Sequence, residues 1–313
     1  MAGRGVLDLA EYALGTKRYR PCAGWNTDSM HYPVDLAFTL RNDSRYYQPK
    51  DADGLPMRTY ASVGDQYSPS RITAWSLSHW NRLQDGASAS RDAVIKGADW
   101  LRSFNDGRFV YRFDWGRIRA PWISCLAQGE GISVLVRAAA LGLNEVREEY
   151  AALARKAMEP MLLTLDDHGV QDAIDGDVFL EEYPDGDAPH VLNGCLYAMV
   201  GLIDLHRFDG STDAAALLDG LSATLERHIM RWDLNGWSAY DLAHERDGGP
   251  ANACTPAYQS LHATLLECIA EDRDLPTCRT VAARWRRSLS NPLTRCRALA
   301  GKIRYRRRHP APS

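Results

Sequence analysis

The sequence lacks the features that mark membrane and disulfide-rich secreted proteins. No stretch approaches about eighteen consecutive apolar residues, the length of a membrane-spanning helix. The first thirty residues lack a basic region followed by an apolar run, so we expect neither a membrane span nor a signal peptide. The seven cysteines form no CxxC pair and their number is odd, which argues against a disulfide framework or a zinc site. Free thiols in a reducing compartment, and hence a cytoplasmic protein, are the expectation.

Motifs for nucleotides, nucleophilic serines and metals are also missing. The Gly129-Glu130-Gly131 stretch lacks the rest of a dinucleotide fingerprint, and there is no GxSxG elbow. The nine histidines are dispersed, so we expect no metal ion and no other cofactor. The formal net charge of −3 over 313 residues gives the whole chain no nucleic-acid signature.

Positive charge is concentrated near the C-terminal end. Between Arg284 and Arg308 there are ten Arg or Lys residues and no acidic residue. Such a segment either binds a polyanion, an anionic membrane surface or a protein partner, or is simply a solvated end. The composition does not choose between the two interpretations.

Helical spacing of apolar residues dominates after a turn-rich beginning. A chain of this length suits one large domain or two ordinary ones. Residues 32–40 hint at a strand, and the alternating aromatic residues of segment 109–115 predict another with one aromatic face. The Ser68-Pro69 pair is a plausible helix start. Periods of three and four predict further helices over 91–104, 132–141, 146–165, 191–205, 218–229, 261–269 and 281–289.

Helix pairs separated by loops rich in Gly, Asp and aromatic residues favour a mainly α fold. We predict an (α/α) toroid of helical hairpins at 66–290, preceded by an irregular, partly β arm at 1–65 and followed by a basic tail at 291–313. In such a toroid the loops at one end form a cleft. No exact sequence repeat supports the ring, so a plain helical array remains the alternative.

Segment 178–194, VFLEEYPDGDAPHVLNG, is the strongest candidate for chemistry. Neighbouring residues of an extended segment point to opposite faces, so Glu182 faces away from Glu181 and Tyr183 unless Pro184 bends the chain. A packed core avoids two adjacent glutamates because burying an unpaired carboxylate is costly. Taken alone, the segment also reads as a solvated acidic loop.

Three other loops lie at the mouths of expected helices, at 122–133, 237–242 and 258–262. In a toroid all four loops line one cleft. Each polar residue in them also has a structural interpretation: Tyr240 and Tyr258 as half-buried aromatics, Gln128 and Asn193 as groups that cap the backbone, and His262 as a core histidine.

In order and spacing, four motifs resemble the C-terminal domain of the glucuronyl C-5 epimerases, which invert glucuronate to iduronate within heparan-type polysaccharides. The motifs are WISCLAQGEGISVLVRA, EEYP followed by LNG, WSAYDL, and a Tyr four residues before His262. The segment YSPSRITAWSLSHWN, at 67–81, looks like the upstream part of the same domain. The resemblance covers roughly residues 50–290 and implies a helical toroid.

The resemblance also implies a tyrosine-rich site. The positions that match the acid–base groups of the family are Glu182, Tyr183, Tyr240 and Tyr258, and Asn193 matches a substrate-contacting position. The chain departs from the family pattern in three respects. It has Ala243 where the family has arginine, Gln259 where it has histidine, and no match to the β-rich domain that precedes the toroid in animal members.

Inverting a uronate at C-5 requires two acid–base groups that flank the sugar ring, one for each face. We hypothesise Glu182 as the base on glucuronate and Tyr258 as the proton donor, while Tyr183 and Tyr240 donate hydrogen bonds to the developing enolate. Arg137 or Arg119 would neutralise the substrate carboxylate. Gln128, Asn193 and His262 are further candidates for substrate binding.

Two alternative functions remain open on the sequence alone. A uronate polysaccharide lyase would abstract the same proton and then expel the glycosidic oxygen. A non-catalytic polysaccharide-binding or assembly protein would keep the cleft without turnover. A homodimer and a glycan synthase bound through the basic tail are possible partners, beside the glucuronate polymer itself.

Overall fold

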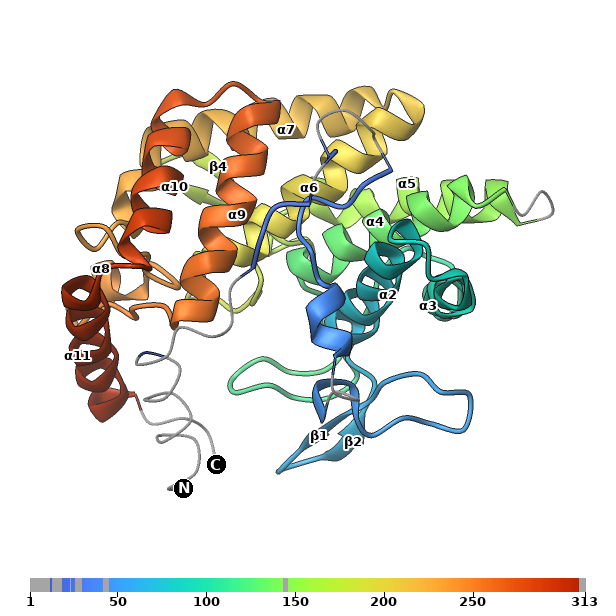
Figure 1. Ribbon diagram of the computed structural model, residues 1–313, viewed down its shortest axis with the longest axis horizontal. Helices are drawn as coiled ribbons and strands as arrows, with labels where there is room; N and C mark the ends of the chain where they lie inside the picture. Colours follow the sequence, from blue (N-terminus) through green and yellow to red (C-terminus); the bar gives the residue numbers. More distant parts are fainter. Residues whose placement is uncertain are drawn as a thin grey trace.

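Helices make up most of the computed structural model, which describes residue 12 and residues 19–22, 24–25, 30–41, 45–142 and 146–309 (Figure 1). Within these residues no helix is both long and apolar enough to cross a membrane. The helices are α2 (Pro69–Gln84), α3 (Arg91–Arg102), α4 (Cys125–Ala140), α5 (Arg147–Met158), α6 (Leu192–Asp209), α7 (Thr212–His228), α8 (Ala243–Asp247), α9 (Pro256–Asp272), α10 (Pro276–Ser288) and α11 (Pro292–Arg308).

The longer helices form successive pairs, α2 with α3, α4 with α5, α6 with α7, and α9 with α10. The first members of the pairs also pack on one another, α2 on α4, α4 on α6, and α6 on α9. They form an inner row, and nearly every residue of α4 is buried. This arrangement confirms the predicted mainly α fold of helical hairpins.

The two central helices, α4 and α6, approach closely because glycine stands at their contact. A Cβ atom added to Gly129 would lie 2.5 Å from the Cα atom of Ala198, and one added to Gly201 would lie 2.6 Å from the Cα atom of Gly129. Any larger side chain would push the helices apart. Gly129, the first glycine of the AQGEG motif, therefore allows α4 and α6 to pack closely.

The described part of the N-terminal segment bridges the two ends of the inner row. The backbone N–H of Tyr19 donates to Ser260 Oγ of α9 at 2.9 Å, and that of Leu36 donates to Asn81 Oδ1 of α2 at 2.9 Å. Tyr32 is fully buried in the main core. The segment thus runs across the helical body. Residues 1–11, 13–18, 23, 26–29 and 42–44 of the expected arm lie outside the described ranges.

Two short antiparallel hairpins accompany the helices, β1 (Arg58–Tyr60) with β2 (Gly64–Gln66) and β3 (Gln171–Ile174) with β4 (Asp177–Leu180). In the second, Asp175 and Gly176 have φ of 51° and 90°. Positive φ at both turn residues, with Asp-Gly, is the preferred geometry of a two-residue hairpin. This hairpin leads directly into the EEYP motif.

The strand predicted at 109–115 is wrong. That segment forms only isolated bridges, from Tyr111 to Trp122 and from Trp115 to Ile118. The rings of Tyr111 and Trp122 stack with centroids 4.0 Å apart, and this pair belongs to a small aromatic cluster of its own. Packing of aromatic rings within a bent loop, instead of a ladder with another strand, explains the alternation.

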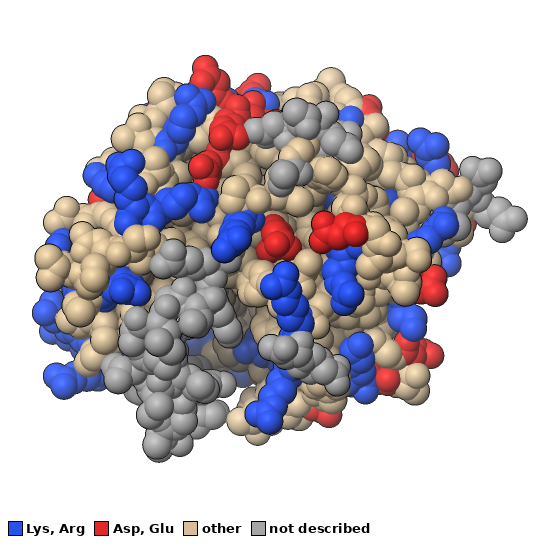
Figure 2. Space-filling model, viewed as in Figure 1, with Lys and Arg blue, Asp and Glu red and all other residues tan. Residues whose placement is uncertain are grey.

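The segment expected as a basic tail contains α11, which is largely exposed. Lys302 Nζ donates to Asn252 Oδ1 at 2.7 Å, and Asn252 in turn donates to Asp241 Oδ2 at 2.7 Å. Lys and Arg side chains gather at the left edge of the molecule, where Figure 1 places α11 (Figure 2). The helix therefore presents a positively charged face beside the loop that carries Tyr240.

Candidate active site

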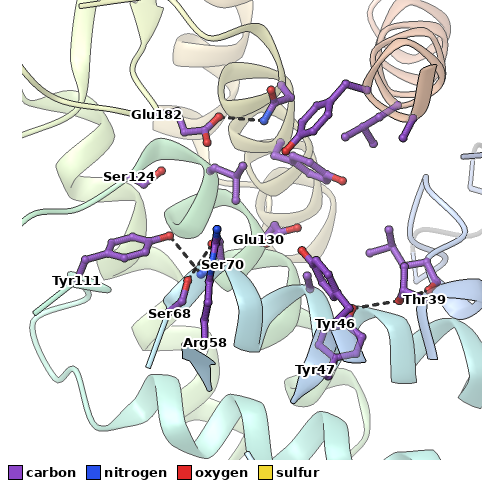
Figure 3. Close-up of a pocket in the computed structure, with 18 of the residues that line it drawn as sticks. Thr39, Tyr46, Tyr47, Arg58, Ser68, Ser70, Tyr111, Ser124, Glu130 and Glu182 are labelled. Carbon is purple, nitrogen blue, oxygen red and sulfur yellow. Dashed lines mark hydrogen bonds between the residues drawn. The ribbon is translucent and has the colours of Figure 1, made fainter. Parts of the chain in front are cut away.

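A cavity of about 700 Å³ lies where the inner helices meet the N-terminal segment, β1 and the aromatic-rich loop at 109–122. Ser124 and Glu130 extend into it from the start of α4, Glu182 from the segment after β4, and Arg58 from β1 (Figure 3). Its other lining residues are mostly aromatic or hydroxyl-bearing, and include Tyr46, Tyr47, Tyr60, Ser68, Ser70, Tyr111, Phe113, Trp115, Trp122, Tyr183, Asn193, Tyr197, Thr255 and Tyr258. Aromatic rings and hydroxyl groups together suit the faces and edges of sugar rings.

Glu182 is the central acidic group of this cavity. Its side chain is held by Asn193 Nδ2, which donates to Oε2 at 2.9 Å, and by the Tyr240 hydroxyl, which donates to Oε1 at 3.5 Å. Burial raises the pKa of Glu182 to about 7, and the hydrogen bonds act in the opposite direction. A Cβ atom added to Gly194 would lie 2.6 Å from the Glu182 Cβ. The LNG motif thus supplies both a donor and the space for this glutamate.

A bend in the chain at Glu182 and Tyr183 brings both side chains into the cavity. Glu181, in contrast, does not line it and accepts the backbone N–H of His190 at 3.1 Å. The sequence left open whether Glu182 and Tyr183 share a face, and the bend before Pro184 decides that they do. The two glutamates therefore have separate surroundings.

Tyr258 stands in the first turn of α9, whose N-terminus is capped by the Thr255 hydroxyl. Its ring meets the Tyr240 ring edge to face with centroids 5.4 Å apart, and 40% of its surface remains exposed within the cavity mouth. Burial by surrounding protein and the nearby Glu182 raise the pKa of Tyr183, Tyr240 and Tyr258. At neutral pH these hydroxyls keep their protons and act as donors.

The structure thus brings Glu182, Tyr183, Asn193 and Tyr258 to one cavity, with Tyr240 in contact behind them. The segment at 122–133, which the sequence suggested as a loop and which forms the start of α4, contributes Ser124 and Glu130. Residues from all four segments singled out in the sequence converge, although these segments come from distant parts of the chain and two of them belong to α4 and α9.

Two of the expected substrate-binding residues lie away from the cavity lining. The Gln128 amide accepts the backbone N–H of Phe109 at 2.8 Å and donates to the carbonyls of Gly107 and Ala157 at 2.7 and 2.8 Å. Through these bonds the side chain joins α4 to the loop at 107–109 and to α5. Arg119 is exposed and pairs with Asp114 at 2.6 Å. Of the two interpretations of Gln128, backbone capping fits its position.

The other two candidates, Arg137 and His262, lie in the core. Arg137 forms a salt bridge with Asp204 at 2.5 Å, and both side chains are essentially inaccessible. Removing either partner would leave a buried unpaired charge, so this arginine is committed to structure. His262 Nδ1 lies 3.0 Å from Ser238 Oγ, and burial lowers the pKa of His262 to about 3. Neither residue is positioned to neutralise a substrate carboxylate.

Arg58 and Glu130 line the cavity but were not singled out from the sequence. The Arg58 guanidinium of β1 lies 4.7 Å from the Tyr60 ring centroid and 5.9 Å from that of Trp115. Nothing in the short segment around Arg58 distinguishes it from a surface arginine. Glu130 could have been identified from the sequence, because it is an acidic residue in a helix that is otherwise apolar enough to be buried.

Glu130 is expected to make stability depend on pH. Thr73 Oγ1 donates to it at 2.6 Å, and burial raises the pKa of Glu130 from 4.5 to about 8. Between pH 4.5 and about 8 the Glu130 carboxyl group keeps its proton in the folded state and releases it in the unfolded state. The contribution of Glu130 to the free energy of unfolding is therefore complete below pH 4.5 and is lost as the pH rises to about 8. Wild-type unfolding free energy should therefore fall by about 2–3 kcal/mol more than that of Glu130→Gln between pH 6 and 8.

Urea denaturation at several pH values measures this difference. Glu148→Gln, at a glutamate whose side chain is 81% exposed, is the matched control and should follow the wild-type curve. Parallel pH curves for wild type and Glu130→Gln would show that Glu130 is ionised in the folded protein.

Comparison with known proteins agrees with the motifs. The family model described as D-glucuronyl C5-epimerase C-terminus matches residues 103–287. The D-glucuronyl C5-epimerase of Caenorhabditis elegans is 32% identical over 286 residues, which cover 85% of this chain and 45% of that relative. The chain therefore spans less than half the length of this curated relative. The match over more than half of the chain, which includes the Glu182, Tyr240 and Tyr258 segments, places the protein in the D-glucuronyl C5-epimerase C-terminal domain family.

Proposed function

We propose that this protein is an epimerase that inverts C-5 of D-glucuronate to L-iduronate within a polysaccharide. The observation that carries the proposal is the shared cavity of Glu182 and Tyr258, with Tyr240 in contact with both. Family membership supports the same reaction. A carboxylate and a phenol at one site supply the two acid–base groups that inversion requires.

In this mechanism Glu182 removes the C-5 proton of glucuronate, and the electron pair of the C–H bond moves into the adjacent carboxylate to form an enolate. Tyr183 and Tyr240 donate hydrogen bonds to groups on which negative charge develops. Tyr258 then gives its hydroxyl proton to C-5 from the opposite face. The resulting phenolate regains a proton from water, and Glu182 loses its proton to water. In the reverse direction the two groups exchange roles.

Arg58 takes the place of Arg119 and Arg137 as the cation for the substrate carboxylate. Its guanidinium lines the cavity, whereas the other two arginines pair with Asp114 and Asp204. A cation beside the carboxylate stabilises the enolate because the carboxylate gains charge in that intermediate. Tyr60 and Trp115 stack near the guanidinium and hold it at the cavity wall.

The polymer proposed as substrate is a heparosan-type chain of glucuronate units. Its negative charge also suits the exposed basic face of α11, which would bind either the polymer beyond the cavity or an acidic surface of a synthase or a second protomer. Mixed aromatic and hydroxyl lining fits successive sugar rings along the cavity.

The decisive experiment is incubation with heparosan in deuterated water, followed by NMR at C-5 and mass spectrometry of chain length. An epimerase incorporates deuterium and forms iduronate while chain length stays constant. Unsaturated short chains would instead identify a lyase. Polymer binding without any deuterium incorporation would identify a non-catalytic binding protein, and either result would overturn the proposal.

A further inference from the structure

Three side chains that can bind a metal converge behind the candidate active site. Asp172 lies on β3, Glu181 follows β4, and His190 lies in the loop before α6. One oxygen of each carboxylate and a ring nitrogen of His190 all lie within 4.8 Å of one another. We propose that these residues form a binding site for a first-row divalent cation, Zn²⁺ or Mn²⁺. The proposal concerns a second site and does not depend on the proposed function.

The distances from His190 Nε2 to the two carboxylates fit one small cation. His190 Nε2 lies 3.0 Å from Asp172 Oδ2 and 3.5 Å from Glu181 Oε1. Ligand atoms bound to one ion at about 2.1 Å are separated by about 3.0–3.4 Å in octahedral or tetrahedral geometry. The ion would replace the proton shared between Nε2 and Asp172. Two carboxylates and one imidazole form a donor set typical of Zn²⁺ and Mn²⁺, whereas Ca²⁺ prefers oxygen donors alone.

The charge of the cluster also favours a cation. The Glu181 side chain is fully buried, and its hydrogen bonds come from the backbone N–H of His190. Asp172 and Glu181 each have a carboxylate oxygen within 3.5 Å of His190 Nε2, and the repulsion between the two carboxylates falls when a cation binds between them. The nearby Arg231 pairs with Asp175 and Glu245, so its charge is compensated.

The surroundings hold the His190 ring in place. His190 has φ of 51°, its carbonyl accepts the Trp232 Nε1–H at 3.1 Å, and its ring packs edge to face on Phe179 at 5.3 Å. These contacts fix the ring before an ion arrives. The Asp172 and His190 side chains are 31% and 20% exposed, so an ion can enter and complete its coordination with water.

Occupation of this site would link β3, the end of β4 and the loop before α6. Glu181 immediately precedes Glu182, and α6 begins at Leu192 and carries Asn193. An ion would therefore fix the two chain segments that position the Glu182–Asn193 hydrogen bond. The histidines are dispersed in sequence; the β3–β4 hairpin brings Asp172 near Glu181, and the loop before α6 brings His190 to both carboxylates.

Calorimetric titration of the chelator-treated full chain with ZnCl₂, MnCl₂, MgCl₂ and CaCl₂ tests the proposal, together with metal analysis of the untreated protein. We expect one equivalent of Zn²⁺ or Mn²⁺, weaker binding of Mg²⁺ and Ca²⁺, and a higher midpoint of thermal unfolding with the bound ion. His190→Phe and Asp172→Ala should each lower the affinity by at least about tenfold, the effect of losing even a partner of a metal ligand.

His228→Gln is the matched control. His228 Nε2 pairs with Asp177 Oδ2 at 2.7 Å and is partly buried like His190, but among the described residues no third His, Cys, Asp or Glu ligand joins this pair. Its substitution should change the metal affinity by no more than about twofold, because substitutions at separate sites usually act independently within that range. The absence of saturable Zn²⁺ or Mn²⁺ binding to the wild-type chain would overturn the proposal, as would equal affinity in the wild type and the folded His190→Phe variant.

Discussion

Glu182→Gln is expected to lower the rate of iduronate formation from heparosan by about 10²- to 10⁴-fold, the usual contribution of a general base. Glutamine keeps the size of the side chain and can still accept the hydrogen bond of Asn193, so the cavity should retain its shape. It cannot take the C-5 proton. The measurement is C-5 deuterium incorporation by NMR, with polymer binding and the circular dichroism spectrum recorded in parallel.

Asp241→Asn provides the control for this experiment. Asp241 is a buried carboxyl group beside Tyr240, but it accepts hydrogen bonds from Asn252 and the backbone of Ala243 and does not line the cavity. Its substitution should change stability more than turnover. If Glu182→Gln retained wild-type deuterium incorporation, Glu182 could not be the base.

Tyr258→Phe is expected to have a similarly large effect, again about 10²- to 10⁴-fold on iduronate formation. The substitution removes only the hydroxyl, so the edge-to-face contact with Tyr240 and the stacking surface for a sugar remain. Glucuronate would then lose its C-5 proton without receiving one on the opposite face. The ratio of iduronate to glucuronate after incubation in deuterated water measures this step.

Tyr67→Phe is a suitable comparison because Tyr67 is also 40% exposed and bonds Asp51 at 2.7 Å, yet it does not line the cavity. It should form iduronate at the wild-type rate. Deuterium in glucuronate without iduronate in Tyr258→Phe would mean that Glu182 exchanges the proton alone and Tyr258 supplies the second face. Wild-type iduronate formation in that variant would remove Tyr258 from the mechanism.

Residues in helices and in short motifs were the easiest to predict. Apolar residues at helical spacing located α6 and α9 because an inner helix must bury nearly all of its surface. The prediction of a strand at 109–115 was wrong because alternating aromatic residues can pack on both sides of a loop without pairing with another strand. The Asp175-Gly176 pair is typical of a two-residue hairpin turn and could have predicted the β3–β4 hairpin, which the helical periodicity did not indicate.

Polar side chains outside the motifs were harder to place. Arg137 and Arg58 are the same residue type, yet one is sealed against Asp204 in the core and the other lines the cavity. Gln128 and Asn193 are both buried amides, but Gln128 ties three backbone segments together and Asn193 holds Glu182. Such roles depend on which partner lies within about 3 Å, and sequence spacing does not encode contacts between distant segments.

By itself, the sequence determined the helical architecture, the family resemblance and the acid–base candidates Glu182, Tyr240 and Tyr258. These depend on periodicity and on residues that are close together along the chain. Only the tertiary structure decided that these groups meet, that Arg58 and Glu130 join the cavity, and that His190 lies beside Glu181 and Asp172. The physical reason is that burial and distance between remote segments set charge, pKa and hydrogen bonding, and both arise only when the helices pack.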